Sequence, residues 1–172
     1  MPGSGKSVAA KVFADAGWPV VRLGDITEEE MQRRGLHAGE QSERTVRESL
    51  RQEFGMAAFA IRNMPRIEKA IQDEHRVVID GMYSMEEYEC FQSHFHQSFH
   101  VLGIIASPAV RHARLARRSY RPLTAQEAVG RDFSEIKNLN KGGPIALADS
   151  SLINESSEEE FRAAILALAH KF

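Results

Sequence analysis

A glycine-rich segment close to residue 1 constrains this chain more than any other feature. Residues 3–7 read Gly-Ser-Gly-Lys-Ser, and an alanine-rich helical pattern follows directly. These residues match the end of the pattern G-x-x-x-x-G-K-S/T, a phosphate-binding loop (P-loop) between a strand and a helix. The match predicts contacts with a bound nucleotide from six consecutive residues: Gly3, Ser4, Gly5, Lys6, Ser7 and Val8.

The residue types of this loop suit a phosphate for physical reasons. Glycines let successive backbone N–H groups turn towards one anion, and the N-terminus of the following helix adds positive partial charge. Lys6 is predicted to reach the β- and γ-phosphates, and the Ser7 hydroxyl to bind Mg²⁺. The loop therefore predicts ATP and Mg²⁺ as cofactors, although its pattern does not distinguish ATP from GTP.

Strand-like and helical patterns alternate along the rest of the chain. Short apolar runs predict strands at 19–23, 76–80, 99–106 and 151–154. Helical patterns separate them, at 6–16, 26–34, 42–54, 56–73, 84–95, 108–118, 124–139 and 157–171. Strands joined by helical crossovers form a parallel sheet that is covered on both faces. We therefore predict a single α/β domain over residues 1–172, with the three-layer P-loop NTPase fold.

The strand that normally precedes a P-loop is missing from this chain, together with the first glycine of the pattern. Without that central strand, the edges of its neighbours would be exposed. Two explanations are open: the true start lies upstream, or the chain is trimmed or degenerate. The intact pattern downstream favours the first.

Two aspartates follow predicted strands, where ligands bind at parallel sheets. Asp80 ends the run Val-Val-Ile-Asp, which is the Walker B arrangement of a carboxylate that holds Mg²⁺; the alternative is an ordinary aspartate in a turn. Asp25 follows the strand at 19–23 and could accept the proton of an attacking hydroxyl. Its alternative role is to cap the helix that begins at Ile26.

Arginines are concentrated after the third strand. Residues 108–123 contain Arg111, Arg114, Arg117, Arg118 and Arg121, and no acidic residue. Three of them, Arg111, Arg114 and Arg118, share one helical face. Crowded like charges suggest an anionic ligand, so we predict a lid-like segment at about 111–127 in which Arg114 and Arg118 act on the transferred phosphoryl group. The alternatives are a solvated basic face and RNA binding.

Further charged residues lie in the helical region between the strand at 19–23 and Asp80, and after the lid. Arg47, Arg51 and Arg62 could bind a phosphate on the acceptor, with Arg51 as the best candidate. Arg131, Asp132 and Glu135 are expected to pair with one another and to have a mainly structural role.

Composition excludes some other classes of protein. The net charge of −2 and the pI near 6.4 argue against nucleic-acid binding over the whole surface. Cys90 is the single cysteine, so an internal disulfide is impossible and a reducing cytoplasm is expected. No apolar run approaches the ~20 residues of a membrane span. The expected partners are a nucleoside triphosphate and a small phosphate acceptor.

Several motifs together resemble a largely archaeal family of nucleotide-kinase-like P-loop proteins, which is similar to dephospho-CoA kinase and, more distantly, to adenylate kinase. The resemblance covers nearly the whole chain and depends on residues 1–7, 24–25, 80–81, 111–121, 146–149 and 153–157. It implies an adenylate-kinase-like sheet topology, an arginine-bearing lid and an acceptor-binding insertion at about 26–73. It also implies that Asn154 approaches the nucleotide base and that Asp25 is the acceptor-side carboxylate. The chain departs from the family at Tyr83, where arginine is common.

Two functions of different classes follow from these patterns. The first is an enzyme that uses Mg²⁺ to transfer the γ-phosphoryl group of ATP to a nucleotide or a coenzyme precursor. The alternative is a nucleotide-binding switch or regulatory ATPase without efficient transfer. The two differ in whether ADP formation depends on an acceptor.

Overall fold

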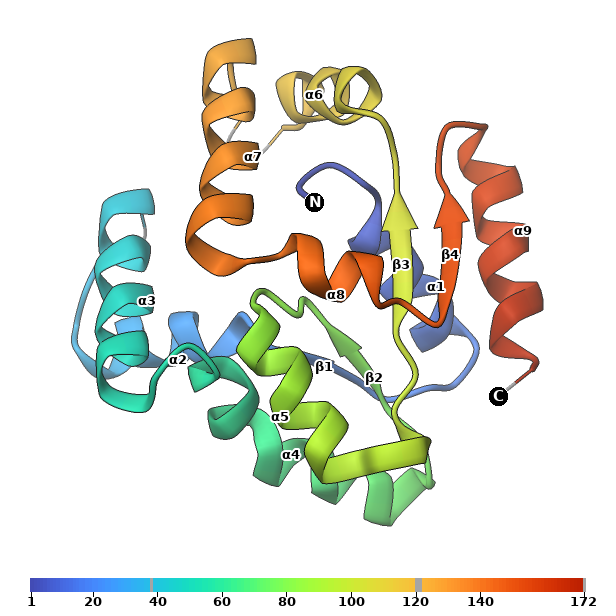
Figure 1. The fold of residues 1–172 in the computed structure, drawn as a ribbon, viewed down its shortest axis with the longest axis horizontal. Helices are drawn as coiled ribbons and strands as arrows, with labels where there is room; N and C mark the ends of the chain where they lie inside the picture. Colours follow the sequence, from blue (N-terminus) through green and yellow to red (C-terminus); the bar gives the residue numbers. More distant parts are fainter. Residues whose placement is uncertain (38, 120–121, 172) are drawn as a thin grey trace. The chain divides into compact units, whose positions relative to one another are not determined.

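The computed structural model describes residues 1–37, 39–119 and 122–171. The chain divides into two compact units. One unit, here called the P-loop unit, combines Met1–Trp18 with His100–Phe172; the other, the middle unit, is Pro19–Phe99. Each unit contains one pair of parallel strands with helices around it (Figure 1). Mixed α/β structure with parallel strands is therefore confirmed.

In the P-loop unit, β3 (Leu102–Ile105) pairs with β4 (Ser150–Ile153). The helices of this unit are α1 (Lys6–Asp15), α6 (Pro108–Arg117), α7 (Ala125–Leu139), α8 (Gly142–Ala146) and α9 (Glu158–Ala169). Helix α9 runs alongside β4 and packs against α1 (Figure 1). Apolar side chains between these elements form the core of the unit: Ala9, Val12, Phe13, Leu115, Phe161 and Ile165.

Helix boundaries in the P-loop unit follow from local sequence. Pro108 occupies the first position of α6, where its missing N–H costs nothing. Helices α7 and α9, predicted at 124–139 and 157–171, begin with capping boxes at Thr124 and Ser157. The short helix α8 follows Lys141. Pro144 is tolerated there because it lies in the first turn, where backbone N–H groups have no helical acceptor.

In the middle unit, β1 (Val20–Arg22) pairs with β2 (Val78–Asp80). The helices are α2 (Asp25–Arg33), α3 (Glu40–Phe54), α4 (Ala58–Glu74) and α5 (Met85–Phe95), followed by the 3₁₀ helix η1 (His96–Ser98). Buried side chains form the core of this unit: Leu23, directly after β1, and from the helices Val46, Phe59, Ile67 and Phe91. The buried amide of Asn63 donates hydrogen bonds to the carbonyls of Leu23 and Phe59, so it joins α4 to the end of β1.

The start of α2 differs from the sequence prediction. The helix was predicted over 26–34, but it begins at Asp25, and Thr27 is buried within it. The N–H of Thr27 donates to the carbonyl of Gly24, which closes the first turn directly after the strand. Ser84 caps α5, because its hydroxyl accepts from the N–H of Glu87. Among the described helices, none has the length and apolar character needed to span a bilayer.

Candidate phosphate-binding site

The backbone of the P-loop adopts conformations that only glycine accepts easily. Gly3 has a φ of 75° and Gly5, which precedes α1, a φ of 102°. A Cβ atom on Gly3 would lie 2.7 Å from the carbonyl oxygen of Arg111, and one on Gly5 would lie 2.2 Å from Nδ2 of Asn154. The glycines therefore serve both the turn and close packing. Beyond Gly5, the first amides of α1 have no acceptor within the helix and can bind an anion.

Asn154 joins the loop to the end of the sheet. Its side chain is buried, and Nδ2 donates to the carbonyl oxygen of Ser4 over 2.8 Å. Its Oδ1 accepts from Nη2 of Arg114 over 3.3 Å, and its backbone N–H donates to the carbonyl of Ile105 over 2.7 Å. One residue at the end of β4 thus contacts the P-loop, α6 and β3. The contact with the nucleotide base that was expected of Asn154 stays a prediction.

Arg114 holds an unused donor beside this junction. Its Nη1 is buried and has no hydrogen-bond partner among the described residues, whereas its Nη2 contacts Asn154. A buried donor without a partner costs about 1–3 kcal/mol. An anion bound at the loop would supply the missing acceptor.

Arg111 lies on the same helix but has a different role. It is only 4% exposed and makes a bidentate ion pair with Asp132, with both N···O distances 2.7 Å. It also donates to the carbonyls of Ala106 and Pro2. Its donors are therefore used within the protein, and Arg111 is a structural residue, not a ligand-binding partner of Arg114. Asp132 pairs with Arg111 and not, as expected, with its own neighbours in sequence.

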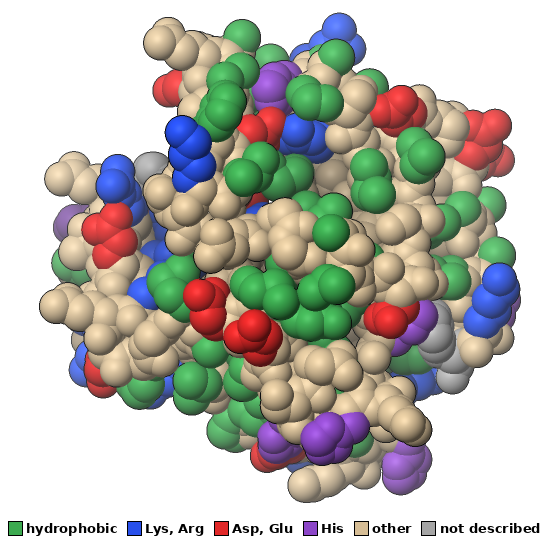
Figure 2. Space-filling view, in the orientation of Figure 1, with side chains coloured by type: hydrophobic (Ala, Val, Ile, Leu, Met, Phe, Trp, Pro, Cys, Tyr) green, Lys and Arg blue, Asp and Glu red, His purple; other side chains and the backbone are tan. Residues whose placement is uncertain are grey.

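Acidic, basic and histidine side chains gather where α6 faces α7 (Figure 2). His112 completes this group, with Nε2 2.9 Å from Asp132. Burial acts to raise the pKa of Asp132, but hydrogen bonds from Arg111 and His112 bring that pKa below its ordinary value. The carboxylate thus stays charged and holds α6 against α7.

Lys6 and a buried ion pair bring more charge to the loop. Nζ of Lys6 donates to the carbonyl of Met1 over 2.8 Å, which shows that the side chain folds back over the loop. Lys141, 4% exposed, contacts Glu135 over 2.6 Å. Burial acts to raise the pKa of Glu135, but the charges of Lys141, Arg131 and Lys6 bring it below its ordinary value. Glu135 is therefore within electrostatic reach of the loop lysine.

Sequence reasoning missed Lys141. A lysine before Gly-Gly-Pro has the signature of an exposed turn, and nothing in its neighbours predicts burial. The partner expected for Glu135, Arg131, does contact it, but over 3.5 Å. Ser7 is exposed, and Val8 is half-buried with its N–H donating to the carbonyl of Gly5 over 3.0 Å. The contacts predicted for these two residues with Mg²⁺ and nucleotide stay predictions. Ser4 is fully buried, and its hydroxyl has no partner among the described residues.

The other arginines of the lid are only partly described. Arg118 follows α6 directly and is half-buried. Arg121 lies outside the described residues, and so does part of the predicted lid at about 111–127. Arg117 is exposed in the last turn of α6. The roles predicted for Arg118 and for the lid therefore stay predictions.

Asp25 and Asp80 belong to the middle unit, at the carboxyl ends of its two strands. Because β1 and β2 are parallel and Arg22 pairs in register with Asp80, these ends meet at one edge of the sheet. Asp25 is the first residue of α2, and no side chain caps this helix. Its carboxylate is 39% exposed and lies 3.4 Å from Arg22. The structure thus leaves Asp25 accessible to a ligand.

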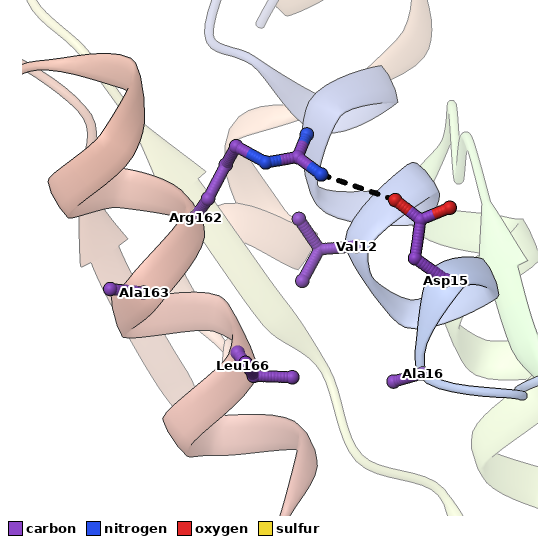
Figure 3. A pocket seen from close by; sticks show the side chains of 6 residues that line it. All are labelled: Val12, Asp15, Ala16, Arg162, Ala163 and Leu166. Atoms are coloured by element: carbon purple, nitrogen blue, oxygen red, sulfur yellow. Dashed lines mark hydrogen bonds and ion pairs between the residues drawn. The ribbon is translucent and has the colours of Figure 1, made fainter.

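A groove between α1 and α9 offers no alternative site for phosphate. It is lined by Val12, Asp15, Ala16, Arg162, Ala163 and Leu166 (Figure 3). Its one cationic group, Arg162, contacts Asp15 over 3.1 Å. Over the described part of the chain, three or more His, Cys, Asp or Glu residues nowhere form a group that could hold a metal ion.

The loop, the helix that follows it and the parallel strands define a P-loop nucleotide-binding domain. In agreement, a family model described as an AAA domain matches residues 1–129. The chain is also 35% identical to the UPF0200 protein of Pyrococcus abyssi, over 99% of this chain and 92% of that protein. The UPF0200 protein of Pyrococcus furiosus is 38% identical, over 96% of this chain and 90% of that protein. The chain belongs to the UPF0200 family and carries this AAA domain.

A solved structure supports the fold at lower sequence similarity. TT1252 from Thermus thermophilus superimposes with a TM-score of 0.56 over 99% of this chain and 94% of that one, at 20% identity. The comparison concerns the fold alone. It agrees with the P-loop NTPase fold predicted from the sequence.

Proposed function

We propose that this protein is an ATP-dependent kinase that phosphorylates a small acceptor, either a nucleotide or a coenzyme precursor. The observation that carries the proposal is the unused, buried Nη1 donor of Arg114, which Asn154 links to the P-loop. Nucleotide binding alone needs only the loop. A preorganised guanidinium beside it is the kind of group that stabilises charge on a phosphoryl group during transfer.

The proposal gives each site residue a role. Backbone amides of residues 3–8 would hold the phosphates, and Lys6 would neutralise the β- and γ-oxygens. Arg114, assisted by Arg118, would donate to the transferred group. Ser7 and Asp80 are oxygen donors of the type that Mg²⁺ prefers, and the bound ion would neutralise phosphate charge.

Asp25 would act on the acceptor. Its accessible carboxylate would take the proton of the attacking hydroxyl as the bond between that oxygen and the γ-phosphorus forms. The bond between the γ-phosphorus and the bridging oxygen breaks, and ADP leaves. An accessible carboxylate in this position supports transfer over a simple switch, because a switch needs no group to take a proton from a hydroxyl acceptor.

ADP formation with and without candidate acceptors tests the proposal. We expect turnover to depend on an acceptor. Arg114→Ala should lower kcat by about 10²–10³-fold and change nucleotide affinity by only a few-fold. Arg117→Ala is the matched control, because Arg117 is exposed on the same helix, and it should leave kcat unchanged. Slow ADP release that ignores every acceptor would instead favour the switch, and equal loss of binding and turnover in Arg114→Ala would contradict a role in the transition state.

A further inference from the structure

A lysine at the junction of α7 and α8 brings a buried positive charge into the P-loop unit (Figure 1). Lys141 is buried, and its Nζ lies 2.6 Å from Oε2 of Glu135, which is buried as well. The backbone joins the same two residues, since the N–H of Lys141 donates to the carbonyl of Glu135 over 3.3 Å. Apolar residues often stabilise a protein as well as a buried ion pair does, so stability alone is a weak reason for this pair.

Hydrogen bonds place the pair beside the P-loop. Nη1 of Arg111 donates both to the carbonyl of Pro2, over 3.2 Å, and to Oδ1 of Asp132, over 2.7 Å. One guanidinium group therefore separates Asp132 from the start of the loop. Glu135 lies three positions after Asp132 on α7, and residues with this spacing share one face of a helix. The face of α7 that directs Asp132 towards the loop thus also carries Glu135 and, through it, Lys141.

Several cations act on the one carboxylate of Glu135. Arg131 contacts it over 3.5 Å, in addition to Lys141. Burial acts to raise the pKa of Glu135, but Lys141, Arg131 and Lys6 outweigh burial and lower that pKa. A single carboxylate cannot balance three positive charges. An anion bound at the loop, where Lys6 lies, would be attracted by the charge that Glu135 leaves over.

We propose that Lys141 is a second cation for the phosphates of a nucleotide bound at the P-loop, and that Glu135 is the residue that positions it. The inference rests on the nucleotide binding that the proposed function requires, and it adds a determinant of nucleotide specificity. Lys6 serves the β- and γ-phosphates. Because Lys141 and Lys6 act on the same carboxylate, Lys141 would act on the same end of the nucleotide. ADP lacks the γ-phosphate, so Lys141 should favour ATP over ADP.

The test measures the affinities for ATP and ADP by calorimetry in a variant without the pair. Lys141→Met combined with Glu135→Gln removes both charges and keeps side chains of similar size, so neither buried charge is left without its partner. We expect ATP affinity to fall at least about tenfold and ADP affinity by only a few-fold, which lowers the preference for ATP. A loss of stability alone would not change this ratio.

Glu135→Asp tests the positioning role separately. It keeps both charges but shortens the acidic side chain by one methylene, so Lys141 loses its present placement. The preference for ATP should fall in this variant too, by less than in the double variant. A wild-type ratio of ATP to ADP affinity in Glu135→Asp would show that Glu135 does not position Lys141.

Lys137→Met is the matched control. Lys137 lies on α7 as well, exposed and 5.4 Å from the ring centroid of Phe133, and its substitution should leave both affinities unchanged. A wild-type ratio in the double variant, or an equal change in Lys137→Met, overturns the proposal. Because the titrations contain no acceptor, their outcome is independent of whether phosphoryl transfer occurs.

Discussion

The side-chain amide of Asn154 donates a 2.8 Å hydrogen bond to the carbonyl of Ser4, across 150 positions of sequence. Asn154 follows the last strand, whereas Ser4 lies in the P-loop. The bond is buried, so water cannot replace it at low cost. The conformation of the phosphate loop therefore depends on the distant end of β4 as well as on its own glycines.

Asn154→Ala should weaken both the fold and nucleotide binding. The substitution leaves the carbonyl of Ser4 without its partner and removes the acceptor for Arg114. We expect the free energy of unfolding to fall by about 1–3 kcal/mol in urea unfolding, and ATP affinity to fall in calorimetry. Asn138→Ala, which removes an exposed contact to Ser134 on α7, should change neither quantity. Unchanged ATP affinity in Asn154→Ala would show that ATP binding by the loop does not depend on this hydrogen bond.

Replacing Gly5 by alanine should destabilise the folded protein, whereas replacing Gly130 by alanine should stabilise it. Gly5 has a φ of 102°, and its Cβ would clash with Asn154, so Gly5→Ala should cost about 1–3 kcal/mol of stability. Gly130 lies within α7 with open space around it. Gly130→Ala should therefore stabilise the protein by about 0.4–1 kcal/mol. Thermal unfolding of both variants gives the sign of each change in Tm. Equal changes in Tm would refute the close packing inferred at Gly5.

The Arg111–Asp132 ion pair should contribute far more to the free energy of unfolding than an ion pair on the surface does. Arg111 is 5% exposed in its side chain and Asp132 14%, so Asp132→Ala leaves a buried guanidinium without its carboxylate. We expect a loss of about 3 kcal/mol. Glu48→Ala removes the exposed Arg44–Glu48 pair and should cost less than about 1 kcal/mol. Chemical unfolding of both variants gives the comparison; a loss at Asp132 no larger than at Glu48 would show that burial adds nothing to this pair.

The same carboxylates should make stability depend on pH. The pKa values of Asp132 and Glu135 lie below their ordinary values in the folded state, so the unfolded chain binds protons first as pH falls. Their contribution is complete above about pH 5 and is lost as pH falls through about 4 and below. The double variant Asp132→Asn, Glu135→Gln should therefore lose less stability than the wild type between pH 6 and 3. Parallel urea curves at both pH values measure this difference; an equal loss in the two proteins would contradict it.

Local signals in the sequence were sufficient for most elements of this fold. Helix starts at Ser84, Thr124 and Ser157 could be predicted because capping depends on residues three positions apart. The partners of Arg111 and Lys141 could not, since each is chosen by packing between elements. A periodic run of arginines predicted one shared role, yet α7 contributes Asp132 to Arg111 and leaves Arg114 with an unused donor.

Lys6→Ala gives the sharpest test of the loop itself. Lys6 follows Gly5 at the start of α1, and its Nζ folds back onto the carbonyl of Met1, over the loop where phosphates would bind. The substitution removes the one cation that the P-loop pattern supplies to the β- and γ-phosphates, so we expect ATP binding to fall below detection in calorimetry. Lys11→Ala is the matched control, because Lys11 is on the same helix but exposed and paired with Asp15; it should bind ATP as the wild type does. Wild-type ATP affinity in Lys6→Ala would mean that the nucleotide binds elsewhere.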